Sequence, residues 1–199
     1  MADLLENAGP DAPTLCEGWQ TRDLAAHLVV RERRLDAAGG ILIKSLSARL
    51  ARVQAEFSAL PYEELLHLIR TGPPKRSLFG IPGADEAANT VEYFVHCEDV
   101  RRVGAEWQPR DLDRAFSEAL WTRLTRMARL AGRRSPVGLI FRRPDGQAVV
   151  ARKGTPVVTV DGEPGELLLF AMGRQATARV ELAGDADAIA RVRSAKFGI

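Results

Sequence analysis

The sequence has little of what marks membrane, secreted or nucleic-acid-binding proteins. No apolar run among its 199 residues approaches the roughly 20 residues that a transmembrane helix needs. The two cysteines, Cys16 and Cys97, are too few for a disulfide framework, and residues 1–9 lack the basic and apolar regions of a signal peptide. A formal net charge of +2 is too small to favour nucleic acid or an anionic membrane. We expect a cytoplasmic protein, monomeric or homodimeric, with neither kind of partner.

The chain changes character near residue 133. Before it, apolar residues recur every three or four positions, as in amphipathic helices. After it come short β-branched runs broken by glycine and proline. The sequence therefore predicts an α+β protein, with an antiparallel helical bundle over residues 1–132 and a small α/β domain over residues 133–199.

The periodicity and the turn residues also predict where the elements lie. The helices of the first part are expected at residues 21–38, 44–59, 61–70, 85–104 and 111–132. Thr21 and Asp111 are the expected N-caps of two of them. In the second part, strands are expected at residues 137–141, 147–152, 155–160 and 177–182, and helices at 163–172 and 185–194. Asp145-Gly146, between the first two strands, is typical of a hairpin turn.

Three polar residues in apolar helical surroundings are the candidates for chemistry. His27 has three apolar residues on either side, while Glu92 and His96 lie four positions apart on one face of a later helix. Because a buried polar group without a partner is unfavourable, one divalent metal ion that binds all three would stabilise them. The alternative is a core histidine hydrogen-bonded to a backbone carbonyl. The same spacing also occurs at Glu63 and His67, which are expected to face solvent.

Several neighbouring residues could orient the imidazoles or approach an ion. The candidate hydrogen-bond partners of the imidazoles are Asn89, Asp99 and Asp23. Asp99 could instead pair with Arg102, which we slightly favour from the spacing. Trp19 precedes the His27 helix, and a role in packing is favoured over one as a platform for a cofactor. Cys16 lies in the same loop, where a buried inert thiol is favoured over a role near the metal.

Three segments carry a resemblance to a known family. Residues 14–28 resemble the opening signature of the mycothiol-dependent maleylpyruvate isomerase family, which belongs to the DinB-like metal-binding bundles. Residues 89–102 resemble its second ligand helix, and residues 158–174 resemble its C-terminal α/β domain, which is similar to sterol-carrier folds. The likeness is to an actinobacterial branch rather than to the isomerase itself, so it does not imply the maleylpyruvate substrate. Two features depart from the family: its first helix is usually longer, and Cys97 replaces a histidine of relatives and is assigned to packing.

The resemblance implies a site and a chemistry. Its ligand pattern falls on His27, Glu92 and His96, with zinc as the expected ion and nickel or iron as chemical alternatives. It also implies mycothiol as a cofactor and a small electrophile as substrate, so the expected function is a thiol-using isomerase or S-transferase. Asp99 and Arg174 are weaker candidates for a role in catalysis. Arg174 could bind a carboxylate of the thiol or substrate, although a surface role is favoured.

Three other functions stay open from the sequence. A metal site without catalysis would be closed by a fourth ligand, with Cys16 or Asp99 as candidates, whereas an enzyme keeps one position open. A carrier of small hydrophobic molecules would need a tunnel within residues 133–199, whose apolar content suits only an ordinary core. A DNA-binding regulator is disfavoured by the near-neutral charge and the lack of a separate basic helix. Since no fourth ligand stands at a fixed spacing, we expect an enzyme.

Overall fold

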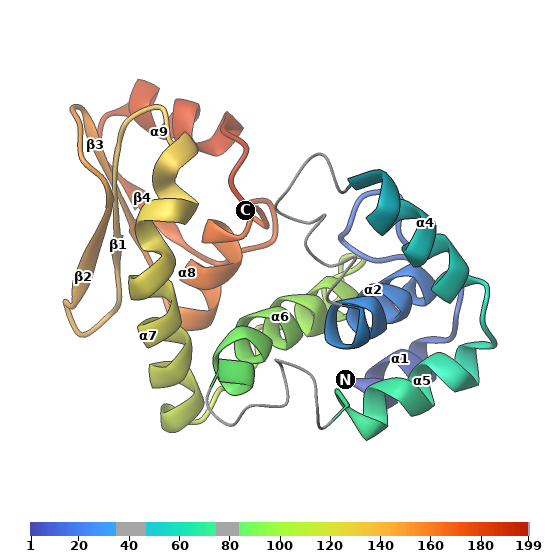
Figure 1. Ribbon diagram of the computed structural model, residues 1–199. Helices are drawn as coiled ribbons and strands as arrows, with labels where there is room; N and C mark the ends of the chain where they lie inside the picture. The colour runs from blue at the N-terminus through green and yellow to red at the C-terminus, as the bar shows by residue number, and fades with distance from the viewer. Residues whose placement is uncertain (35–46, 75–83, 199) are drawn as a thin grey trace. The chain divides into compact units, whose positions relative to one another are not determined.

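The computed structural model describes residues 1–34, 47–74 and 84–198 (Figure 1). The expected end of the His27 helix near residue 38 and the expected start of the next helix at residue 44 lie outside these ranges. Within them, the expected helices and strands are present, most with ends displaced by a few residues. A helix at Ala2–Ala8 was not among the expected elements, and the strand expected at 177–182 is only Glu181–Ala183. The chain combines helices with a small sheet, so the predicted α+β class is confirmed.

The chain divides into two compact units, Met1–Trp107 and Gln108–Ile199. The boundary expected from the sequence follows residue 132. The difference concerns one helix, α7 (Arg114–Ala131), whose contacts are with the sheet and helix of the second unit. No helix in the described part of the chain is both long enough and apolar enough to cross a bilayer.

The first unit is mainly helical in its described residues, with loops such as residues 9–20 between the helices. Its α-helices are α1 (Ala2–Ala8), α2 (Thr21–Arg33), α4 (Ser47–Ser58), α5 (Tyr62–Thr71) and α6 (Ala84–Arg101). Helix α2 lies between α4 and α5 and contacts both of them as well as α1 (Figure 1). Leu24 and Leu28 of α2 and Leu65 of α5 are among the fully buried core residues of this unit. The apolar positions of α2 occupy most of its circumference, which explains why a helix with such a sequence lies inside the unit.

The loop before α2 is fixed at both ends. A capping box begins the helix, in which the backbone N–H of Gln20 donates to Oδ2 of Asp23 at 3.0 Å. The expected N-cap, Thr21, was wrong by one position: Thr21 is the first helical residue, and its hydroxyl donates to the carbonyl of Gly9. Further back, the N–H of Leu15 donates to the carbonyl of Asp99 at 2.9 Å. This bond holds the loop against the end of α6.

The second unit is built around a four-stranded sheet in the order β2-β1-β3-β4. Its elements after α7 are a short 3-10 helix (Gly132–Arg134), β1 (Gly138–Arg142), β2 (Ala148–Arg152), β3 (Val157–Asp161), α8 (Pro164–Ala171), β4 (Glu181–Ala183) and α9 (Ala186–Ser194). Strand β1 pairs antiparallel with β2 and parallel with β3, while β4 is antiparallel to β3. Asp113, not the expected Asp111, caps α7 by accepting from the N–H of Phe116 at 2.9 Å.

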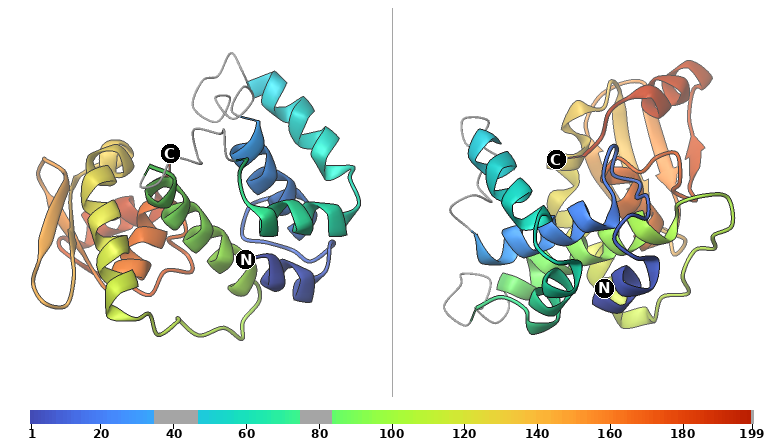
Figure 2. Two further views of the ribbon diagram at one scale, coloured as in Figure 1. Left: turned by 60° about the horizontal axis from the view of Figure 1, so that its bottom comes forward. Right: turned by 90° about the vertical axis from the view of Figure 1, so that its right-hand side faces the viewer.

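Helix α7 belongs to this unit because its buried face packs on β2 and α8, as Figure 2 shows from two further directions. Gly132, directly after the end of α7, lies close to β2, since a Cβ built there would lie 2.7 Å from Cβ of Ala151. Helix α8 is buried along its whole length. The ring of Phe170 lies 6.3 Å from that of Phe141 and 5.4 Å from that of Phe197. The apolar stripe that suggested a bundle helix in α7 therefore covers a sheet instead.

Candidate metal centre

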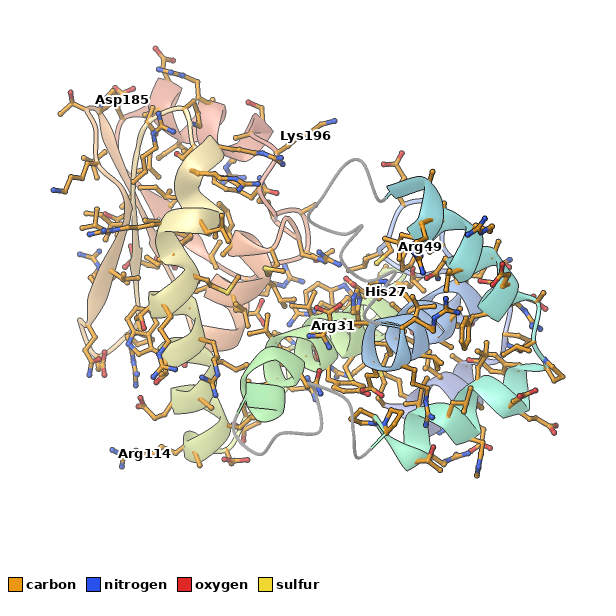
Figure 3. All side chains as sticks on the ribbon, in the orientation of Figure 1. His27, Arg31, Arg49, Arg114, Asp185 and Lys196 are labelled. Carbon is orange, nitrogen blue, oxygen red and sulfur yellow. The ribbon has the colours of Figure 1, made fainter. Side chains whose placement is uncertain are left out.

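Helices α2 and α6 bring the three predicted ligands to one point. Nε2 of His27 lies 2.9 Å from Oε1 of Glu92, and Nε2 of His96 lies 3.2 Å from the same oxygen. One ligand atom from each of the three residues lies within 4.8 Å of the other two. His27 leaves α2 on the side that faces α6 (Figure 3). The partner of His27 is thus a carboxylate, not the backbone carbonyl that an ordinary core histidine would bind.

The three side chains are largely buried but keep some exposure to solvent. The exposed fractions are 13% for His27, 22% for Glu92 and 10% for His96. The two imidazole rings meet edge to face, with centroids 5.3 Å apart, and the indole of Trp19 lies 5.2 Å from the ring of His27. Trp19 also packs against the core of the unit, in agreement with its expected packing role. All three side chains therefore keep some exposure to solvent.

The other ring nitrogen of His96 has a carboxylate partner of its own. Nδ1 of His96 lies 2.8 Å from Oδ2 of Asp99, whose side chain is fully buried. The thiol of Cys16 donates to the same oxygen at 3.2 Å, and its sulfur lies 4.0 Å from Nδ1. Arg102, the partner slightly favoured for Asp99 from the spacing, donates to Glu98 at 2.6 Å.

These contacts bear on the choice between a closed and an open site. Cys16 and Asp99 lie on the Nδ1 edge of His96, whereas Glu92 lies at Nε2. Neither residue can therefore complete a ligand set centred between the Nε2 atoms and Glu92. Among the described residues, the groups that could hold an ion together are His27 with Glu92 and His96, and the separate group of Cys16, His96 and Asp99.

Arg31 is part of the site and was missed from the sequence. Its Nε lies 3.6 Å from Oε2 of Glu92, and its guanidinium donates to Oδ1 of Asn89. Asn89, a predicted partner of the imidazoles, thus accepts from Arg31. Arg31 lies four residues after His27, one helical turn away, so both side chains face α6 (Figure 3). The four-residue spacing from His27 was the sequence feature that could have identified Arg31.

The surroundings shift the pKa values of the acid and of one imidazole. Burial by itself raises the pKa of Glu92, but hydrogen bonds from the two imidazoles and the charge of Arg31 outweigh it, and the pKa lies well below its usual value. Burial lowers the pKa of His96, but hydrogen bonds with Asp99, Cys16 and Glu92 outweigh this and raise it to about 11. At neutral pH Glu92 is therefore ionised and His96 is protonated, and a metal would have to displace that proton.

Two solved structures resemble the chain over most of its length, whereas no protein-family profile and no curated protein matches it. One is a mycothiol-dependent maleylpyruvate isomerase, at 18% identity and a TM-score of 0.60. The other is a histidine-to-alanine variant of such an isomerase, at 20% identity and a TM-score of 0.62. Each match covers 92% of this chain and 86% of the other. The chain has the fold of this isomerase.

The isomerase fold confirms the resemblance expected from the sequence motifs. The divalent metal that the family resemblance implies also fits the residues present here. A tetrahedral zinc ion with bonds of about 2.0–2.2 Å separates its ligand atoms by roughly 3.3 Å. The Nε2 atoms of His27 and His96 lie 2.9 and 3.2 Å from Oε1 of Glu92. Small side-chain movements would reach that geometry, and the donor set is one that catalytic zinc sites use.

The remaining predicted residues lie elsewhere or have other partners. Asp23 caps α2 and accepts from the hydroxyl of Ser58 at 3.3 Å. Cys97 contacts Met1, with 3.4 Å between their sulfur atoms, as its expected packing role requires. Arg174 belongs to the second unit, where its Nη1 donates to the carbonyl of Met172 at 2.6 Å. Its role in binding stays a prediction.

The second copy of the motif provides an internal comparison. Glu63 and His67 are separated by four residues on α5, like Glu92 and His96 on α6, and both are exposed as expected. The buried face of α5 consists of Leu65, Leu66 and Ile69. The spacing alone is therefore not sufficient, and the apolar surroundings distinguish the two pairs.

Proposed function

We propose that this protein binds one divalent metal ion through His27, Glu92 and His96 and acts as a thiol-using isomerase or S-transferase. The observation that carries the proposal is a three-residue ligand set which the described residues do not close with a fourth ligand. Three protein ligands and one open position are the pattern of catalytic zinc sites. Zinc is the proposed ion, although nickel and iron tolerate the same ligands.

The ion would act as a Lewis acid that lowers the pKa of a thiol or water in the remaining position. The protein's own groups would prepare that position. Asp99 orients the ring of His96 through Nδ1, so that Nε2 faces Glu92. Arg31 keeps the carboxylate of Glu92 ionised and in place. Trp19 limits the movement of the His27 ring from the other side.

A thiol activated at this place supports two reactions. For an isomerase, the thiolate adds to an activated double bond, the resulting single bond rotates, and elimination releases the thiolate and restores the double bond. For a transferase, the thiolate displaces a leaving group and stays attached to the product. The resemblance to an enzyme named for its dependence on mycothiol favours mycothiol as the thiol. The substrate need not be maleylpyruvate, since the identity is only 18%.

Two other functions receive less support. A purely structural metal would be expected to have a fourth protein ligand, but Cys16 and Asp99 lie on the wrong edge of His96 for this role. A hydrophobe carrier would need an apolar cavity in the second unit. The pocket of about 560 Å³ at the edge of its sheet is lined largely by charged residues, among them Arg142, Asp161 and Glu181.

Metal titration with matched histidine variants tests the proposal. We expect the parent chain to bind one zinc ion, His27→Ala to lose that affinity, and His67→Ala to keep it, because His67 occupies the same motif on an exposed helix face. Turnover of an electrophile by the zinc-loaded parent should require an added thiol. The proposal fails if His27→Ala binds zinc as tightly as the parent does.

A further inference from the structure

A pocket of about 790 Å³ lies beside the candidate metal centre and within the first unit. One wall comes from α2 and the loop before it, through Trp19, Asp23 and His27. The opposite wall comes from α4. Sites for small molecules commonly measure about 300–1,000 Å³. The pocket thus has the size of a ligand site, and a molecule inside it touches the same histidine that is proposed to bind the metal.

The wall from α4 is mainly apolar. Ala51 and Ala55 are four residues apart and share one face of α4, and Ala59 follows directly after the end of the helix. All three are exposed to solvent although they line the pocket. Together with Leu50 and the aromatic ring of the half-buried Trp19, they offer a mainly apolar surface. The polar side chains of this wall, Gln54 and Ser58, both donate to Asp23, at 2.7 and 3.3 Å. Such a wall suits the hydrocarbon or aromatic body of a ligand, not a sugar with many hydroxyl groups.

The charge of the pocket excludes another class of ligand. Among its described lining residues, Asp23 is the single side chain with a permanent formal charge. Its carboxylate accepts from the N–H of Gln20 at 3.0 Å and from Ser58 at 3.3 Å. The nearby guanidinium of Arg22 lies outside the lining and donates to two backbone carbonyls, those of Ser58 and Leu60. An anionic ligand body would therefore face a carboxylate, and the lining that the structure describes includes no lysine or arginine.

We infer that this pocket selects an electrophilic substrate with an uncharged, apolar body, and that its reactive end lies toward His27. The inference rests on the proposed function and adds the substrate class to it. The α4 wall provides the apolar contact, Trp19 provides an aromatic surface, and Asp23 disfavours carboxylates. An acid such as maleylpyruvate does not belong to this class.

The experiment uses a matched pair of unreactive probes, 3-phenylpropanamide and 3-phenylpropanoate, which share one body and differ in charge. Binding is measured by calorimetry on the full-length protein, first treated with a chelator so that no metal attracts the carboxylate, and then loaded with zinc. We expect the metal-free protein to bind the amide at least about tenfold more tightly than the carboxylate. Equal or tighter binding of the carboxylate to the metal-free protein would overturn the inference.

Two variants and a control locate the effect. Ala55→Leu fills the pocket and should weaken amide binding about fivefold or more. Ala48→Leu makes the same change on an exposed part of α4 outside the lining and should leave binding unaltered. Asp23→Asn preserves a capping side chain and should narrow the preference for the amide. If Ala55→Leu binds the amide like the parent, or if Ala48→Leu weakens it equally, the pocket is not the binding site.

The results distinguish a failure of this inference from a failure of the proposed function. Zinc binding that depends on His27, combined with no preference for the amide, would refute the substrate class and leave the metal site in place. Selective amide binding by a protein that takes up no zinc would support the pocket and refute the thiol chemistry. Thermal unfolding of each variant checks that it is folded.

Discussion

Replacing Asp99 by asparagine tests how the site is built. The side chain of Asp99 is fully buried, and its Oδ2 accepts from Nδ1 of His96 at 2.8 Å and from Cys16 at 3.2 Å. Asp99→Asn keeps the size and one acceptor oxygen but removes the charge that orients His96 and increases its basicity. Partners of ligand histidines typically contribute about 10- to 100-fold to metal affinity. We expect the zinc Kd to rise by that factor, or about 1.4–2.7 kcal/mol.

The assay is a competition titration against a chromophoric zinc chelator, with thermal unfolding recorded in parallel. Glu98→Gln is the matched control, because Glu98 is the neighbouring buried carboxylate on α6 and bonds to Arg101 and Arg102 at 2.7 and 2.6 Å. The control should lower the unfolding temperature and leave the zinc Kd within about twofold of the parent. Parental affinity in Asp99→Asn, or an equal loss in both variants, would refute the assigned role of Asp99.

Three further predictions follow from the same contacts. Cys16→Ala should weaken zinc binding less than Asp99→Asn does in the same titration, because the Cys16 sulfur lies 4.0 Å from Nδ1 of His96, whereas Oδ2 of Asp99 lies 2.8 Å from it. A loss as large as that of His27→Ala would make Cys16 a ligand. Because its surroundings raise the pKa of His96 to about 11, zinc binding releases a proton from it. The affinity for zinc should therefore rise by up to about tenfold per pH unit for each proton released. A zinc Kd that does not change between pH 6 and 8 contradicts this. Gly132→Ala should lower the free energy of unfolding by about 1–3 kcal/mol in urea denaturation, since its Cβ would lie 2.7 Å from Cβ of Ala151, and an unchanged or higher value would contradict the packing of α7 on β2.

Most helices and strands could be predicted from periodicity, but their partners could not. The pattern over residues 61–70 predicted α5, which occupies Tyr62–Thr71. The apolar stripe of α7 was also correctly identified, yet it was assigned to a helical bundle. A stripe reports that a helix buries one face and does not report whether a helix or a sheet covers that face. Gly132 permits the close approach to Ala151 of β2. A glycine at this position indicates contact with a sheet only when the two segments are already known to be neighbours.

The candidate site was predicted where it depends on spacing within one helix. Glu92 and His96 share a face of α6, and the apolar residues around His27 indicated that it needs a buried partner. The position of Cys16 depends on a backbone hydrogen bond between two distant segments, from Leu15 to Asp99. No local pattern encodes such a contact, so the sequence favoured an inert thiol at Cys16.

X-ray absorption at the zinc edge tests the central claim most directly, because it reports the atoms bound to the ion. For the zinc-loaded protein without thiol, the account predicts imidazole nitrogens and carboxylate oxygen and no sulfur. After a thiol is added, one sulfur should appear at about 2.3 Å. Sulfur bound before any thiol is added, or none bound afterwards, would contradict an open three-ligand site at His27, Glu92 and His96.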